Sequence, residues 1–288
     1  MKKTWSWSIP ILNLGTHRNQ TDEQIQKFCR SAGLAGLEGW GQMLDGKSDD
    51  QVEAMGKSYT DARIPFTTFH LPFSPDIDLA SFYESSRYQA VDTIRRWMDR
   101  SSMLGSKVGI QHPSASRCDV NVEGVDPFLR QLGKSLETLL PHAESLGYIL
   151  AIENMGCSSL AETRFGSQPE HFERIIKAFD HPNLGFCLDA GHALLAMGPQ
   201  RAHEVLDVMG DRLRAFHLAD NAGDRDSHLA PGHGLVDWTP IFRQAARLAF
   251  SGPICIETPP FAPGPDYGVD AFRKMLADTD SLVEKALA

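Results

Sequence analysis

The sequence lacks the features of several protein classes. Its five cysteines are odd in number and never spaced C-x-x-C, which is typical of free thiols in a reducing compartment and not of a disulfide framework or a zinc ribbon. No apolar run approaches the ~18 residues that a membrane span needs. No small-residue cleavage site follows the basic N-terminus, which disfavours a secretory signal. We therefore expect a cytoplasmic protein with no membrane partner.

Positive charge is also scarce. The chain has 28 Lys and Arg residues against 37 Asp and Glu residues, a formal net charge of −9. Proteins that hold nucleic acid do so through clustered Lys and Arg side chains that contact phosphates. We therefore expect no nucleic-acid partner, although net charge alone does not exclude a local basic groove.

No low-complexity segment or Pro/Gly/Ser-rich linker divides the 288 residues, of which 42% are hydrophobic. Short apolar runs instead alternate with amphipathic stretches of helical period. The candidate strands are 4–8, 34–40, 64–70, 107–112, 148–154, 184–189, 213–220 and 253–258. The candidate helices are 21–32, 49–62, 81–104, 125–146, 168–178, 199–209, 239–248 and 269–287.

Eight strand–helix repeats in a chain of this length predict an α/β fold, a single (β/α)8 TIM barrel that forms one domain over residues 1–288. The alternative is an open, doubly wound sheet. That fold more often has a glycine-rich phosphate loop after its first strand, and no such loop is visible here.

Six consecutive predicted strands end in side chains that can titrate or bind a metal. The C-terminal ends of barrel strands converge on one mouth, so these side chains are expected to meet there. One histidine at a strand end is more often a structural residue, but the repetition from strand to strand favours a functional site. The residues are His70, His112, Glu153, Asp189 with His192 beyond it, His217 with Asp220 beyond it, and Glu257.

Three of these residues, Glu153, Asp189 and Glu257, would repel one another and lose hydration in a confined mouth. A divalent cation removes this conflict, and the imidazole of His217 completes a set of three oxygens and one nitrogen. Such a mixed set suits Mn²⁺, Mg²⁺, Co²⁺ or Zn²⁺ without selecting among them. We expect one bound ion, with Mn²⁺ as the first choice.

Several motifs resemble the xylose-isomerase-like barrel superfamily, which includes sugar-phosphate isomerases and epimerases, ketose 3-epimerases, inosose dehydratases and endonuclease IV. The resemblance covers nearly the whole chain, and its motifs are specific for the superfamily but do not select the reaction. They are AIENMG, CLDAGH, FHLADN, HLAPGHGLVDW (228–238) and ICIETP.

The ketose 3-epimerase pattern implies that Glu153, Asp189, His217 and Glu257 hold the metal. It also implies that Glu153 and Glu257 are acid/base groups on opposite faces of a sugar, moving a proton next to a carbonyl through a metal-bound enediolate. His192 matches the imidazole that orients the substrate. The pattern is broken where such epimerases carry an arginine six residues after the histidine, because this chain has Gly223 there, with Arg225 nearby.

The same site is compatible with other functions. A dehydratase or lyase would expel a leaving group from the same intermediate, and a non-catalytic sugar-binding barrel would be expected to have lost a ligand or a glutamate. The endonuclease IV pattern implies three zinc ions, but no basic, aromatic-bearing loop follows the second or third strand to hold a duplex. Its nine ligands would be His70, His112, Glu153, Asp189, His192, His217, Asp226, His228 and Glu257.

A small-molecule carbohydrate is therefore the expected partner. Glu38 and Trp40 end the second predicted strand and are candidate sugar contacts, Trp40 by stacking, although core packing explains them equally well. The remaining candidate substrate contacts are His70, His112, His192, Asp226 and His228. Assembly into a homo-oligomer is left open, because one sequence displays no such surface.

Overall fold

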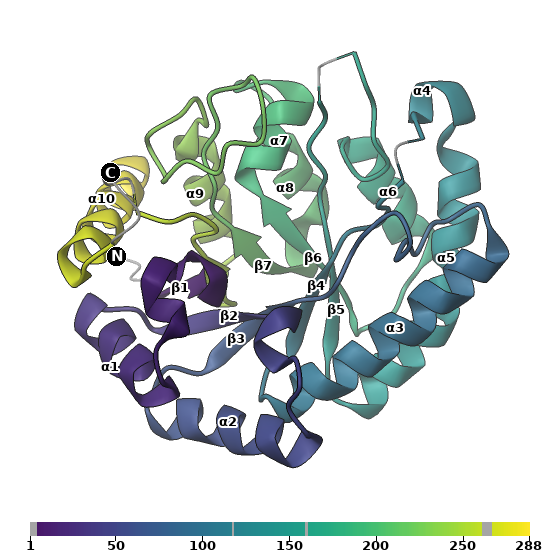
Figure 1. Cartoon of the computed structure of the whole chain (residues 1–288). Helices are drawn as coiled ribbons and strands as arrows, with labels where there is room; N and C mark the ends of the chain where they lie inside the picture. The colour runs from purple at the N-terminus through teal and green to yellow at the C-terminus, as the bar shows by residue number, and fades with distance from the viewer. Residues whose placement is uncertain (1–4, 117, 159–160, 261–266) are drawn as a thin grey trace.

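Eight parallel strands close into a barrel in the computed structural model, which describes residues 5–116, 118–158, 161–260 and 267–288 (Figure 1). Each strand pairs with its sequence neighbours, and β8 returns to pair with β1. The predicted (β/α)8 barrel is confirmed. The strands are β1 Trp7–Pro10, β2 Gly36–Trp40, β3 Phe66–His70, β4 Val108–Gln111, β5 Ile149–Glu153, β6 Leu184–Asp189, β7 Leu213–His217 and β8 Ile254–Cys255.

Helices surround the barrel, and the first and last of them, α1 and α10, are neighbours in this ring (Figure 1). The α-helices are α1 Asp22–Ala32, α2 Asp49–Asp61, α3 Glu84–Met103, α4 Val120–Glu123, α5 Val125–Ser145, α6 Pro169–Ala178, α7 Ala190–Met197, α8 Glu204–Met209, α9 Trp238–Arg247 and α10 Val269–Leu287. Short 3-10 helices are η1 Ile11–Asn19, η2 Gly41–Leu44 and η3 Gly210–Arg212. Within the described residues, no helix is both long and apolar enough to cross a bilayer.

Local sequence signals account for several helix ends. Thr21 and Ser48 each begin a helix with a capping box, in which the hydroxyl accepts from the backbone N–H three residues later. These bonds satisfy donors that the first helical turn leaves unpaired. Gly147 has φ 57° just after α5, the left-handed conformation in which glycine commonly ends a helix.

The start of the barrel and the junction after β6 differ from the sequence prediction. The first strand is Trp7–Pro10 rather than 4–8, because Ser8 pairs with both Gly36 and Cys255 when the barrel closes; Thr4 lies outside the described residues. The helix α7 lies outside the predicted helix ranges. It begins at Ala190, where the Asp189 carboxylate caps it by accepting from the backbone N–H of His192 at 2.6 Å.

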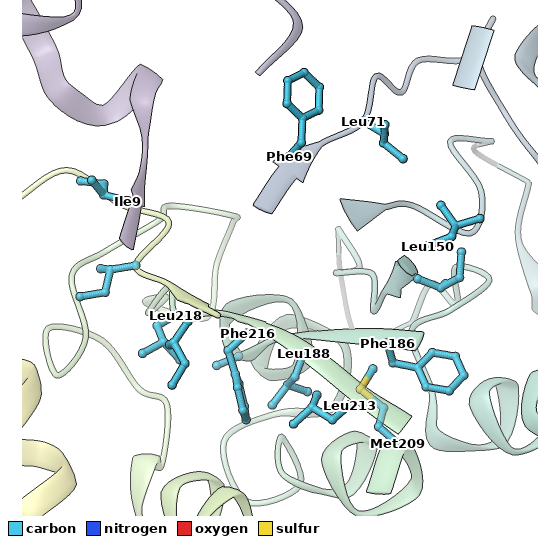
Figure 2. Close-up of a cluster of buried hydrophobic side chains, with 14 of the residues drawn as sticks. Ile9, Phe69, Leu71, Leu150, Phe186, Leu188, Met209, Leu213, Phe216 and Leu218 are labelled. Carbon is cyan, nitrogen blue, oxygen red and sulfur yellow. The ribbon is translucent and has the colours of Figure 1, made fainter. Parts of the chain in front are cut away.

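The main core lies between the barrel strands and the outer helices. Figure 2 shows Phe186 and Leu188 of β6 within this cluster, and Phe186 packs edge-on against Phe172 of α6 with ring centroids 5.4 Å apart. Successive side chains of a strand point to opposite faces, so Cys187, between them, points into the barrel. There it packs in a second, small cluster with Ile110, Ala151 and Ala215.

Candidate metal centre

Side chains of a strand alternate between its two faces, so the residue two positions after each member of the small inner cluster also points into the barrel. Two residues after Ala151, Cys187 and Ala215, the inward positions at the strand ends are Glu153, Asp189 and His217. Glu257 likewise follows Cys255 of β8 by two positions. The barrel wall therefore delivers four polar side chains to one end of its interior.

These four side chains meet. One ligand-capable atom from each of Glu153, Asp189, His217 and Glu257 lies within 4.8 Å of those of the others. His217 Nδ1 is 2.9 Å from Glu153 Oε1 and 3.1 Å from Glu257 Oε2. The structure thus brings together the four residues that the sequence proposed as metal ligands.

Three carboxylate oxygen atoms of this group are left without hydrogen-bond partners. Glu153 Oε2, Asp189 Oδ2 and Glu257 Oε2 are buried, and none accepts a hydrogen bond from the described residues. A buried carboxylate oxygen in this state is costly unless a charge compensates it. A divalent cation satisfies all three oxygens at once, and three carboxylates with one imidazole suit such an ion. The residues present therefore fit a divalent metal.

The pKa values of the group reflect crowding of like charge. Burial, together with the nearby charges of Glu153 and Glu257, raises the pKa of Asp189 to about 7. Burial also acts to raise the pKa of Glu257, but the adjacent His217 outweighs it and the value falls to about 2. The neighbouring acids hold the pKa of His217 well above its usual value despite the opposing effect of burial. Without a cation, this site depends on bound protons to balance its carboxylates.

Two further groups with metal-ligating side chains adjoin the first. In one, His70 Nε2 and His112 Nε2 lie 3.5 and 3.3 Å from Glu153 Oε2. In the other, His192 Nε2 and His228 Nε2 lie 3.3 and 3.1 Å from Asp226 Oδ2. The ligand-capable atoms of each group lie within 4.8 Å of one another. All nine residues that the endonuclease IV pattern implies are therefore present in three adjacent groups, with Glu153 common to two.

Backbone carbonyls orient three of these imidazoles. His70 Nδ1 lies 3.0 Å from the carbonyl oxygen of Leu71, and His192 Nδ1 lies 2.9 Å from that of Asn154. His228 Nδ1 lies 2.7 Å from the carbonyl oxygen of Glu257. Because a carbonyl only accepts, each Nδ1 carries the proton and donates it. The neutral form of each ring therefore presents Nε2 as a lone pair toward its carboxylate neighbour, the state in which histidine binds a metal.

A cavity of about 830 Å³ opens above these groups. Its wall includes most of the predicted site residues, namely Trp40, His70, His112, Glu153, His192, Asp226, His228 and Glu257. Trp40 lies beside His70, with ring centroids 4.6 Å apart. The cavity thus has the size and polarity of a site for a small polar ligand.

The cavity also contains residues that the sequence did not single out. Phe73 packs on His112 with ring centroids 3.9 Å apart and is 38% exposed. Arg164 is the single Lys or Arg among the described lining residues. It is not the arginine of the epimerase pattern, whose position, Gly223, has φ 87° and so favours glycine; Arg225 does not line this cavity.

Glu38 occupies a different place from the one predicted for it. Its side chain is fully buried and lies beneath the cavity rather than in its wall. The oxygen Oε2 accepts from Thr68 Oγ1 at 2.8 Å and lies 2.9 Å from His217 Nε2. The prediction that Glu38 contacts a sugar therefore has no support in the structure, because its partner is a residue of the candidate metal centre.

Residues 26–276 match the family model described as a xylose isomerase-like TIM barrel. The chain belongs to this family. The resemblance found in the sequence motifs is thereby confirmed for most of the chain.

Relatives in this family have different names. The uncharacterized protein MJ1311 of Methanocaldococcus jannaschii is 30% identical over 65% of this chain, which spans 62% of that protein. The probable endonuclease 4 of Streptomyces avermitilis is 26% identical over 72% of this chain and 69% of its own. The fructoselysine 3-epimerase of Escherichia coli O157:H7 is 21% identical over 84% of this chain and 86% of its own.

Solved structures with the same barrel include ketose 3-epimerases. The crystal structure of a D-tagatose 3-epimerase-like protein has a TM-score of 0.77 and 22% identity, and covers 98% of this chain and 100% of its own. L-ribulose 3-epimerase has a TM-score of 0.80 and 14% identity, over 98% and 96%. At these identities the likeness shows the fold alone.

Proposed function

We propose that this protein is a metal-dependent carbohydrate isomerase or epimerase that moves a proton at the carbon next to a carbonyl. The observation that carries the proposal is the meeting of Glu153 and Glu257. Glu153 ends β5 and Glu257 lies two residues after β8. Both lie within 3.1 Å of one imidazole nitrogen and form part of the wall of a polar cavity. Two carboxylates reaching one small-molecule site from separate strands are what proton transfer in two steps requires.

The cation would be held by Glu153, Asp189, His217 and Glu257, with Mn²⁺ the first choice and Mg²⁺, Co²⁺ or Zn²⁺ as alternatives. When bound, a divalent ion supplies the Lewis acidity that makes a C–H next to a substrate carbonyl easier to ionise. The low pKa of Glu153 and of Glu257 keeps both ionised at neutral pH. One would accept the proton from the substrate carbon and later release it to solvent, and the other would take a proton from solvent and donate it to the substrate.

The remaining cavity residues would hold the substrate. His192 and His112 present ring nitrogens for substrate hydroxyls, and Trp40 and Phe73 present aromatic faces for the apolar side of a sugar ring. A small carbohydrate fits a cavity of about 830 Å³.

The test is hydrogen exchange at carbon. The metal-loaded protein would be incubated in D₂O with a panel of ketoses and ketose phosphates, and NMR would follow the carbons beside the carbonyl. We expect deuterium at one of them, together with an isomer or epimer. Substrate deuterated at that carbon should turn over more slowly, which detects C–H cleavage even if the same proton returns. Loss of water in these spectra would identify a dehydratase or lyase instead, and a lack of all change would favour a sugar-binding protein.

A second candidate function, metal-assisted phosphoester hydrolysis, is favoured by the three adjacent groups. His70 and His112 beside Glu153, and His192 and His228 beside Asp226, supply ligands for ions beyond the first, and clustered ions cleave phosphodiesters. The net charge of −9 and a cavity with one arginine among its described lining residues oppose a long nucleic-acid ligand.

Metal content and nuclease activity separate the two candidates. About one ion per chain and no cleavage of a duplex with an abasic site are expected of the isomerase. About three zinc ions with rapid nicking would instead establish the hydrolase.

A further inference from the structure

The orientation of His217 is opposite to that of three other histidines of the site. His70, His192 and His228 each direct Nδ1 to a backbone carbonyl and Nε2 to a carboxylate. His217 directs Nε2 to Glu38 and presents Nδ1 to Glu153 and Glu257. The protein therefore holds this one imidazole through a buried carboxylate instead of a carbonyl.

Glu38 is itself held in place. It lies in register with Thr68 on the neighbouring strand β3, and the Thr68 hydroxyl donates to the same Oε2 that faces His217. Glu38, Thr68 and His217 are each 1% exposed or less. Solvent therefore does not compete for these bonds, and in such surroundings a charged hydrogen bond is strong.

We infer that Glu38 is a positioning residue that fixes the tautomer and ring plane of His217. Accepting the Nε2 proton leaves Nδ1 as the lone pair that faces the cation site, and the negative charge of Glu38 makes that lone pair a stronger donor to a cation. This inference rests on the metal site of the proposed function, and it assigns Glu38 a role outside the substrate cavity.

The neighbouring residue on β3 supplies a matched control. Thr67 points to the other face of the strand, and its hydroxyl donates to the Leu37 carbonyl at 3.3 Å rather than to Glu38. Thr67→Val and Thr68→Val make the same chemical change one position apart. Only the second removes a hydrogen bond to Glu38.

The experiment measures Co²⁺ binding by competition with a chelator and by visible absorption, which reports the ligands and their geometry. Glu38→Gln keeps the shape and removes the charge, and we expect Co²⁺ to bind roughly 10- to 100-fold more weakly, with a changed absorption band. Thr68→Val should weaken binding by less, and Thr67→Val should leave affinity and spectrum as in the wild type. The urea midpoint of each metal-free variant shows whether it folds.

The outcomes separate the inference from the proposed function. A wild-type protein that binds no Co²⁺ overturns both. If the wild type binds Co²⁺ and Glu38→Gln keeps its affinity and absorption band, the metal site stands and the positioning role is wrong. If Glu38→Gln does not fold, Thr68→Val decides, because an affinity equal to that of Thr67→Val overturns the role of this carboxylate.

Discussion

Glu153 joins the histidines of the site into one network. Its Oε2 lies 3.5 Å from His70 and 3.3 Å from His112, and its Oε1 lies 2.9 Å from His217 and 3.5 Å from His192. Burial acts to raise the pKa of Glu153, but these imidazoles outweigh it and hold the value well below the usual range. The charge of this one carboxylate therefore orders most of the cavity floor.

Removing the charge of either proposed acid/base glutamate should slow the chemistry. Glu153→Gln and Glu257→Gln should each lower kcat on the substrate found in the exchange assay by about 10²- to 10⁴-fold, the usual contribution of a general acid or base. Glu153→Gln should also bind metal more weakly than the wild type. The control is Glu137→Gln on the exposed face of α5. Wild-type exchange in either site variant would remove that glutamate from the mechanism.

A histidine outside the site should make stability depend on pH. His171 Nδ1 accepts from the backbone N–H of Gly166, so the ring must be neutral there, and burial lowers its pKa from 6.5 to about 4. The folded state thus binds the proton more weakly than the unfolded state. This contribution is complete above about pH 6.5 and is lost as the pH falls toward about 4.

Urea unfolding at several pH values tests this prediction. Between about pH 6.5 and 5, the titration of His171 should remove about 2 kcal/mol from the free energy of unfolding. His171→Gln cannot titrate, so its free energy of unfolding should fall by that much less over the same interval. Parallel pH curves for the two proteins would show that His171 gains its proton equally in both states.

At the residue scale, the sequence predicts which candidate ligands meet better than it predicts the residues that contact them from below. Glu153, Asp189 and His217 could be found because a barrel gathers strand ends, whichever residues occupy them. The role of Glu38 could not be found, because its partner His217 lies 179 positions away. Phe73, in the loop after β3, follows no periodic pattern that would mark it.

At the scale of elements, the junctions around the site share residues with it. Asp189 ends β6 and caps α7 with its oxygen Oδ1. Its other oxygen, Oδ2, has no hydrogen-bond partner among the described residues. The sequence around Gly191 and His192 has weak helix propensity, which hides the true start of α7 at Ala190. The Asp189 cap stabilises the start of α7 where helix propensity is weak. From the sequence, Asp189 is interpreted as a candidate metal ligand and is therefore not identified as a helix cap.

The segment between β7 and α9 is organised by Asp220. Its Oδ1 accepts from the backbone N–H groups of Asn221 and Val236, and its Oδ2 accepts from that of Gly232 and from the Trp238 indole. The carboxylate is fully buried. The segment that carries Asp226 and His228 is therefore tied at both ends to one side chain.

Asp220→Asn should loosen this segment, because an amide has one acceptor oxygen and leaves two of the four donors unpaired. We expect the free energy of unfolding to fall by about 2 kcal/mol or more, measured by urea titration. Backbone hydrogen exchange should rise over residues 221–237. Asp224→Asn, at an exposed position in the same segment, is the control. Equal exchange in the two variants would mean that other contacts hold the segment.

At the scale of the whole molecule, closure of the barrel sets the bounds and register of the first and last strands, which the strand–helix repeats do not specify. Eight strand–helix units were readable from hydrophobic period, and each predicted helix range contains a helix. The ends of the chain were harder, because β1 and β8 join through only two register pairs, Trp7 with Ile254 and Ser8 with Cys255. The register between β1 and β8 depends on the curvature of the other strands, and no local sequence pattern indicates that curvature. β8 is accordingly Ile254–Cys255 rather than the predicted 253–258.

Because its proposed ligands come from β5, β6, β7 and the residues after β8, a bound cation should stabilise half of the barrel wall. A ligand at 100 times its Kd adds about 2.7 kcal/mol to the free energy of unfolding, which for a chain of this size raises Tm by roughly 4 to 5 °C. Thermal unfolding of the metal-stripped protein with and without Mn²⁺ measures this, and a chelator should reverse it. Glu257→Gln removes one ligand and should largely lose the shift. An increase in Tm as large as that of the wild type in this variant would mean that the ion binds elsewhere. Bound protons alone would then have to balance the charges of these carboxylates.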